Sequence, residues 1–127
     1  MILVDTSIWL RFFMRHPVAQ RLDALLRQEQ VAGHELVYGE LLIGDRGGRT
    51  AFLPTYEKFY YARTVPHSDV VSLVSIRKLH GRGVGWIDTQ LLASALIEGM
   101  KLWTADPRFA AIAEELGVAW GAPHRVN

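Results

Sequence analysis

Four acidic residues lie where strands or helices of this sequence are expected to begin or end, each beside apolar residues: Asp5, Glu40, Asp88 and Asp106. Charged groups avoid apolar surroundings unless they are paired with an opposite charge or bound to a metal ion. The residues next to these acids are neutral and carry hydroxyl or amide groups: Thr6, Ser7, Thr89, Gln90 and Thr104. Carboxylates gathered without a basic partner repel one another, and a divalent cation relieves that repulsion. Because oxygen ligands of this kind suit Mg²⁺ or Mn²⁺, the residue types indicate metal-assisted chemistry.

Each acid also has a simpler structural explanation. Asp5 could cap a helix over Ile8–Phe13, and Asp88 in a first helical turn would complement the helix dipole. Glu40 could be another first-turn acid. Asp106 stands directly before a proline, which is typical of an N-cap. If Asp106 is considered without the other acids, capping explains it better than catalysis does. What these explanations leave unaccounted for is the presence of four acids in one expected region.

Short apolar stretches alternate with helical patterns along the chain. Ile2–Val4 is expected to form a strand buried on both faces with Asp5 at its carboxyl end, and Lys101–Thr104 is expected to form another strand. The alternation predicts an α/β fold, a three-layer α/β/α sandwich with a central parallel sheet and a central first strand. Carboxyl ends of parallel strands share one edge, where ligands bind in open sheets of this type. We therefore expect the four acids to surround one cleft, in a single domain of residues 1–127.

The remaining elements are predicted from helical periodicity and from glycine and proline signals. The expected helices run from Pro17 to Gly33, over Gly39–Gly44, through Phe52, Tyr56, Phe59 and Tyr60, from Ser68 through Leu79, from Trp86–Asp88 to Gly99, and from Pro107 through Leu116. The expected further strands are Glu35–Val37, Tyr61–Val65 and Val118–Trp120.

The composition excludes several classes of protein. The chain has 127 residues, half of them apolar, which is enough for one domain with a core. It has no cysteine, which excludes disulfides and thiolate metal sites and suits a reducing cytoplasm. No apolar run approaches transmembrane length, and the N-terminal residues do not form a signal peptide.

The net charge of +1 produces no overall attraction to nucleic acid. RNA phosphates would therefore have to be held by local basic residues, for which Arg46 and Arg82 are candidates. A solvated surface position explains either arginine equally well.

Four short motifs carry a resemblance to a known family, in that family's order and over essentially the whole chain: Val4–Ser7, Gly39–Leu42 with Gly44, Asp88 with Leu91–Ala93, and Thr104–Asp106 with Phe109. With these motifs the sequence resembles the PIN-domain ribonucleases, in particular the toxin half of VapBC-type toxin–antitoxin pairs. The resemblance implies that the acidic quartet binds the metal and is catalytic: Asp5, Glu40, Asp88 and Asp106. It also implies that the hydroxyls of Thr6 and Thr104 lie beside the metal.

The resemblance further implies an activity and partners. We expect a Mg²⁺-dependent endoribonuclease, with Mn²⁺ as a possible substitute, that acts as a toxin in a prokaryotic cytoplasm. Its partners would be RNA, a small antitoxin protein and a second copy of the chain in a homodimer, with no membrane. Two other classes stay open, a non-catalytic module that binds RNA or an antitoxin and a receiver-like signalling domain. The receiver pattern is matched poorly, because Asp5 has no adjacent second acid and no lysine ends a late strand.

Overall fold

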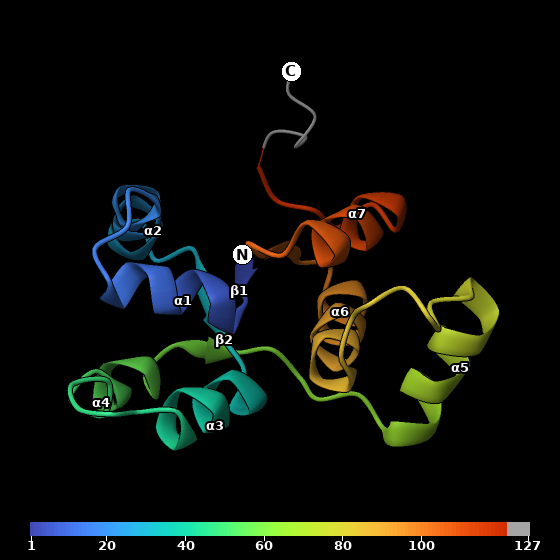
Figure 1. The fold of residues 1–127 in the computed structure, drawn as a ribbon, viewed down its shortest axis with the longest axis horizontal. Coiled ribbons are helices and arrows are strands. Elements are labelled where there is room, and N and C mark those ends of the chain that lie inside the picture. The colour runs from blue at the N-terminus through green and yellow to red at the C-terminus, as the bar shows by residue number, and fades with distance from the viewer. Residues whose placement is uncertain (122–127) are drawn as a thin grey trace.

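A parallel sheet forms the centre of the computed structural model, which describes residues 1–121 (Figure 1). Its strands are β1 (Ile2–Val4), β2 (Val31–Gly33), β3 (Tyr60–Tyr61) and β4 (Lys101–Trp103), in the order β3-β2-β1-β4. In the register of the sheet, Leu3 lies opposite Ala32 on one side and Leu102 on the other. All residues of β1 are buried, which explains why this strand is apolar throughout.

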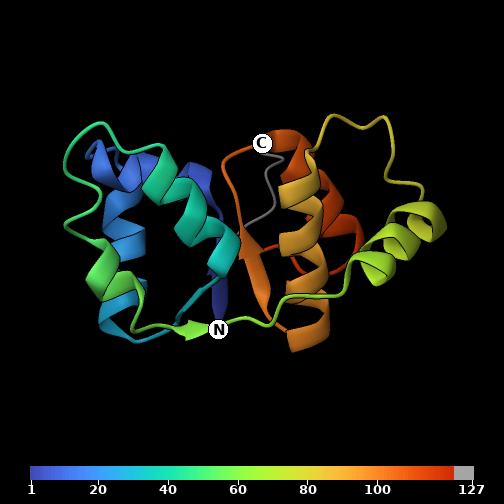
Figure 2. The same cartoon turned by 90° about the horizontal axis from the view of Figure 1, so that it is seen from below.

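Helices cover both faces of the sheet, so the expected three-layer α/β/α sandwich with a central first strand is confirmed. One side carries α1 (Thr6–Phe13), α2 (Val18–Arg27), α3 (Glu35–Ile43) and α4 (Leu53–Tyr56), and the other carries α5 (His67–Arg77), α6 (Trp86–Glu98) and α7 (Pro107–Glu115) (Figures 1 and 2). This division follows from right-handed crossovers. The chain moves from β1 towards β3 with helices on one face, and then returns to β4 across the other face.

An aromatic cluster fixes the helices of the first layer against each other. Trp9 of α1 is fully buried, with its ring centroid 5.2 Å from that of Phe52 and 5.6 Å from that of Tyr56. Phe59, directly before β3, stacks on the same indole with ring centroids 6.1 Å apart. The aromatic spacing therefore predicts the core correctly at Phe52, Tyr56 and Phe59. It is wrong for Tyr60, which is 53% exposed and belongs to β3, and the helix is short and ends at Tyr56.

The prediction for residues 28–38 is wrong in one respect. The strand expected at Glu35–Val37 is the start of α3, and the second strand lies just before it at Val31–Gly33, a stretch assigned to the end of the preceding helix. The side chain of His34 causes the change, because its Nδ1 accepts a hydrogen bond from the backbone N–H of Leu36 and thereby caps α3.

The other predicted elements differ from the structure mainly at their ends. The strand expected at Tyr61–Val65 is β3 at Tyr60–Tyr61, and the N-cap of α5 is Pro66 where Ser68 was expected. The last expected strand, Val118–Trp120, is a single parallel bridge between Leu102 and Ala119. The helix expected from Trp86 and the helix expected from Pro107 are present as α6 and α7. The expected single domain of residues 1–127 extends beyond the described residues at its C-terminal end.

Within residues 1–121, no helix combines the length and the apolar character needed to cross a membrane. The expected location in the cytoplasm stays a prediction.

Two glycines, Gly33 directly before His34 and Gly39 directly before Glu40, provide a test of this packing. A Cβ at Gly33 would lie 2.8 Å from a ring carbon of Tyr61 and 3.2 Å from one of Tyr56, whereas a Cβ at Gly39, inside α3, would meet no atom within 4 Å. We predict that Gly33→Ala lowers the free energy of unfolding by about 1–3 kcal/mol through overpacking. As the matched control, Gly39→Ala should raise it by about 1 kcal/mol, because alanine favours a helix interior. Urea unfolding of both variants measures the two effects, and equal effects would contradict the close approach at Gly33.

Candidate functional site

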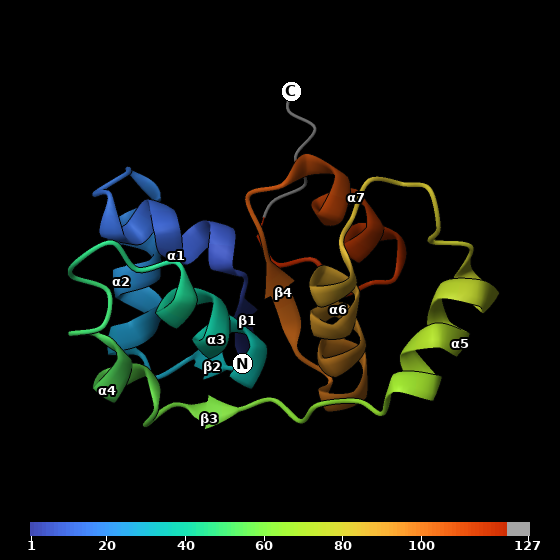
Figure 3. The ribbon, with the colours of Figure 1, turned by 60° about the horizontal axis from the view of Figure 1, so that its bottom comes forward.

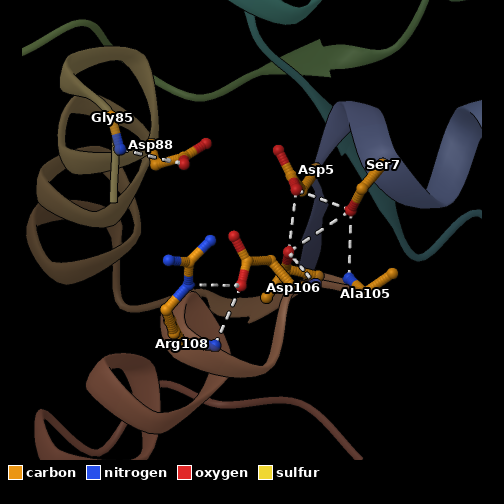
Figure 4. A network of polar contacts seen from close by, with 8 residues as sticks. Asp5, Ser7, Gly85, Asp88, Ala105, Asp106 and Arg108 are labelled. Atoms are coloured by element: carbon orange, nitrogen blue, oxygen red, sulfur yellow. Dashed lines mark hydrogen bonds and ion pairs between the residues drawn. The ribbon is translucent and has the colours of Figure 1, made fainter. Parts of the chain in front are cut away.

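Asp5 lies directly after β1, at the edge of the sheet where the strands end. Its backbone N–H donates to the carbonyl of Trp103 at 2.9 Å, which continues the pairing of β1 with β4. Although Asp5 is the N-cap residue of α1, its side chain makes no capping hydrogen bond. Its Oδ2 instead accepts hydrogen bonds from Ser7 Oγ at 2.7 Å and Thr104 Oγ1 at 2.8 Å (Figure 4). The explanation of Asp5 as a simple helix cap is therefore wrong.

Two hydroxyl groups join the ends of β1 and β4 around this carboxylate. Thr104, buried and directly after β4, also accepts a hydrogen bond from the backbone N–H of Asp106 at 3.1 Å. Ser7 Oγ accepts a hydrogen bond from the backbone N–H of Ala105 at 3.0 Å. Thr104 thus lies beside an acid of the quartet, as expected. Ser7, which the sequence analysis does not assign to the site, contacts the same carboxylate because it follows Asp5 by two residues at the start of a helix.

Glu40 reaches the same edge from α3. Its Oε1 accepts a hydrogen bond from Thr6 Oγ1 at 2.6 Å, and this bond joins α3 to the first residue of α1. Thr6 therefore orients Glu40, whereas Thr104 orients Asp5. Both threonines contact quartet carboxylates through hydroxyl groups that carry no charge.

Asp88 faces these groups from the first turn of α6, on the opposite side of the site in Figure 4. Its Oδ2 accepts a hydrogen bond from the backbone N–H of Gly85 at 3.3 Å. The pKa of Asp88 is raised to about 6, chiefly by burial and then by the negative charges of Asp5, Glu40 and Asp106, whereas the hydrogen bond from the Gly85 N–H lowers it. The charges of the other three acids therefore act on Asp88, which agrees with the expectation that the four lie near one another.

Asp106 is the acid that matches its simpler explanation. It is the N-cap of α7, and its Oδ1 accepts a hydrogen bond from the backbone N–H of Arg108 at 2.9 Å. The guanidinium Nε of Arg108 also lies 3.8 Å from that oxygen. The expectation that the acids have no basic neighbour is therefore wrong at this position. The local sequence does not reveal this contact, because it depends on the arginine side chain turning back towards the N-cap residue of its own helix.

The two arginines predicted to bind RNA have different surroundings. Arg82, in the loop before α6, forms an ion pair with Glu115 of α7, so a partner already offsets its charge. Arg46 is exposed in the loop after α3. In that loop the carboxylate of Asp45 accepts backbone hydrogen bonds, chiefly from Arg49 and Gly47, which hold the pKa of Asp45 at about 2. An RNA contact at Arg46 or Arg82 stays a prediction.

The quartet suits a hard divalent cation in charge and in ligand type. It offers carboxylate oxygens from four different elements. The pKa of Asp88 is raised first by burial and then by the charges of the other acids, and a cation would offset that second contribution. In the conformation observed, however, the carboxylates face hydroxyl and N–H donors. Across residues 1–121, no three Asp, Glu or His side chains are arranged to hold one ion together. A single ion held by several of these acids would therefore require their carboxylates to come closer together than they are in this conformation.

Comparisons with known proteins identify the family. The family described as PIN domain matches residues 2–115. Ribonuclease VapC32, found in two strains of Mycobacterium tuberculosis, is 41% identical over 120 residues, which cover 94% of this chain and 95% of that protein. The crystal structure of PAE2754 from Pyrobaculum aerophilum superposes with a TM-score of 0.57 over 87% of this chain and 82% of that one. At 20% sequence identity, it supports the fold alone. This chain belongs to the PIN-domain family, among its VapC-type members.

Proposed function

We propose that this protein is a Mg²⁺-dependent endoribonuclease that hydrolyses RNA phosphodiester bonds and acts as the toxin of a toxin–antitoxin pair. The observation that carries the proposal is the placement of four acids on different elements that meet at one edge of the sheet: Asp5 after β1, Glu40 on α3, Asp88 on α6 and Asp106 before α7. Their charges add to the effect of burial in raising the pKa of Asp88. A relative 41% identical over most of the chain is named a ribonuclease, which supports the same reaction. The homodimer and the cytoplasmic location that the resemblance implies are part of the proposal.

Asp5 and Asp88 would hold the metal ion, with Glu40 and Asp106 completing the site. The chemistry that a bound Mg²⁺ supplies is a water of lowered pKa and positive charge close to the phosphate. Ser7 and Thr104 fix Asp5 through Oδ2, and within residues 1–121 no hydrogen-bond donor is paired with its Oδ1. These hydroxyls orient the carboxylate without neutralising it, so its charge remains available to a ligand.

Arginine side chains around the site are suited to the RNA backbone. Arg108 lies beside Asp106, and Arg46 extends from the loop after the helix of Glu40. Guanidinium groups bind phosphate oxygens through charge-assisted hydrogen bonds. Such contacts would position the RNA without reading its sequence.

A non-catalytic module that binds RNA or an antitoxin is the alternative. Such a module would use the same arginines, but it would not need four acids placed close enough for their charges to act on one another. The receiver-like alternative is not proposed, because the chain belongs to the PIN-domain family.

A partner protein is the second half of the proposal. An open, mostly apolar hollow runs along α1 and is lined by Ser7, Leu10, Arg11, Met14 and His16. Met14 is 78% exposed, so its apolar side chain is available to a small antitoxin. Because the hollow begins at Ser7, beside Asp5, the partner could also bring a basic residue to the carboxylates.

We predict that Mg²⁺ supports cleavage of a structured RNA by the purified protein, that excess EDTA stops it, and that added Mg²⁺ or Mn²⁺ restores it. Asp5→Asn should reduce the cleavage rate at least about 100-fold, since loss of groups that merely orient metal ligands already costs roughly 10–100-fold. The control is Asp23→Asn, on α2, where the carboxylate pairs with Arg27 at the surface and should not affect the rate. Gel analysis of time courses measures the cleavage rates of the wild type, Asp5→Asn and Asp23→Asn. Cleavage that persists in EDTA would refute the metal dependence, and RNA binding without cleavage at any metal concentration would favour the non-catalytic alternative.

We predict that Asp88 makes a contribution to the stability of the metal-free protein that is lost as the pH rises, which is measured as the difference between wild type and Asp88→Asn. The folded-state pKa of Asp88 is about 6, above its unfolded value of roughly 4. Its stabilising contribution is therefore present below pH 4 and is lost as the pH rises through 6. Asp88→Asn removes this dependence and, in EDTA at pH 7.5, should melt no lower than wild type.

Mg²⁺ should raise the melting temperature of the wild type, because it binds the folded state, and that of Asp88→Asn much less. The control is Asp69→Asn, which alters an exposed first-turn acid of α5. It should lose about 0.3–1 kcal/mol and keep the full response to Mg²⁺. If Asp88→Asn behaves like Asp69→Asn in melting curves, Asp88 is an ordinary helix acid.

We predict that Met14→Asp prevents binding of the proposed antitoxin while RNA cleavage persists. The matched control is Ile76→Asp, which replaces a side chain that is 75% exposed. It lies on α5, at the opposite end of the molecule from α1 (Figure 3). Co-purification and inhibition of cleavage measure the effect. Equal binding by wild type and Met14→Asp would place the partner elsewhere.

A further inference from the structure

His34 lies fully buried at the sheet edge that carries the quartet, although it is not one of the acids. It directly follows β2, as Asp5 follows β1 and Thr104 follows β4. Burial lowers its pKa, so the ring is neutral at physiological pH. A neutral imidazole has one N–H donor and one acceptor, and both need partners in the core.

The contacts of the ring define which nitrogen carries the proton. Nδ1 accepts the backbone N–H of Leu36 at 3.1 Å and therefore carries none. The proton is then on Nε2, which lies 2.9 Å from Ser94 Oγ and donates to it. Ser94 is also fully buried, in the middle of α6. Nδ1 of the ring thus caps α3, and Nε2 forms a hydrogen bond to α6.

The backbone of His34 is fixed as firmly as its ring. Its N–H donates to the hydroxyl oxygen of Tyr56 at 2.9 Å, and its carbonyl accepts the N–H of Tyr38 at 2.9 Å. Tyr56 is fully buried in the aromatic cluster around Trp9. The ring therefore cannot move relative to the first helical layer without breaking core contacts.

The two helices joined by this ring carry opposing members of the quartet. Glu40 lies on α3 six residues after His34, and Asp88 lies on α6 six residues before Ser94. Among the side-chain hydrogen bonds of residues 1–121, the bond from His34 to Ser94 is the one that links α6 to α3 and its cap. The two helices belong to different layers, on opposite faces of the sheet (Figure 2).

We propose that His34 is a positioning residue, whose hydrogen bond to Ser94 sets the spacing of α3 and α6 and thereby the separation of Glu40 from Asp88. The role in metal binding rests on the proposed function, whereas the role in helix spacing does not. A group that orients metal ligands from behind typically contributes about 10–100-fold to metal affinity.

The first test measures the spacing directly and needs no activity. The chain has no cysteine, so Ile43→Cys on α3 and Ile97→Cys on α6, which replace side chains 88% and 58% exposed, accept two spin labels. Pulsed electron resonance then gives the distribution of distances between the helices. In this labelled background, Ser94→Ala removes the acceptor but keeps the cap of α3. His34→Asn keeps a capping oxygen but is too short to reach Ser94.

Both variants should broaden or shift the distance distribution. Leu22→Ala, which opens the core under α2 and lowers the melting temperature without touching this bond, should leave the distribution unchanged. An unchanged distribution in Ser94→Ala and His34→Asn, or an equal change in Leu22→Ala, would overturn the proposal.

The second test measures metal affinity from the rise in melting temperature with Mg²⁺. Each single variant should raise the half-saturating Mg²⁺ concentration roughly 10-fold, and the double variant no further, because both changes remove one bond. Leu22→Ala should leave that concentration unchanged. Losses that multiply in the double variant would mean that the two side chains act separately, and would overturn the role in metal binding. If the wild type does not respond to Mg²⁺, the proposed function fails, and the distance measurement still decides whether His34 sets the helix spacing.

Discussion

Buried polar groups at the ends of parallel strands must find partners inside the protein, and the site depends on how they do so. Asp5, His34 and Thr104 each follow a strand and are at most 5% exposed. The sheet cannot satisfy them, because its strands have only two or three residues and end just before these positions. Their partners come from the helices and loops that meet this edge. The fold of the edge and the arrangement of the carboxylates therefore have a common cause.

The kind of partner determines what an acid can do. A buried arginine beside Asp5 would offset its charge and occupy its oxygens, whereas Ser7 and Thr104 donate hydrogen bonds and leave the negative charge in place. Arg108 does approach Asp106, but its side chain is 69% exposed, so solvent screens much of that interaction. The edge therefore keeps an excess of negative charge. This excess adds to the effect of burial on Asp88, whose pKa is raised first by burial and then by the charges of the other three acids.

Local sequence signals predicted the elements whose ends are determined locally. The pair of Asp106 and a following proline defines the start of α7, and Gly99 in a left-handed conformation ends α6. The second strand was misplaced because Val31–Gly33 is too short to show a period, and its glycine was taken for a helix end. That glycine is needed for the close approach of Tyr61 and Tyr56.

Long-range side-chain bonds could not be predicted from the same signals. Thr6 and Glu40 are 34 residues apart, and His34 and Ser94 are 60 residues apart. Such pairs have no spacing rule, since they depend on which strands become neighbours. The four acids could be selected from their positions at element ends and from the family motifs. The role of the Ser7 hydroxyl could not be predicted, because serine is common at helix starts. The capping role of His34 could not be predicted either, because histidine is uncommon as a cap.

The same edge thus combines two opposite solutions to polar burial. At His34, each ring nitrogen has a protein partner, so the residue stabilises the junction of three elements and has no capacity left for a ligand. At Asp88, a backbone N–H contacts one oxygen at 3.3 Å, and burial together with the nearby charges disfavours the ionised form. A site that holds its ligand through strained carboxylates needs rigid neighbours, since otherwise the carboxylates would move apart and relieve their repulsion. His34, a neutral residue whose two ring nitrogens both have hydrogen-bond partners, provides that rigidity without reducing the negative charge of the site.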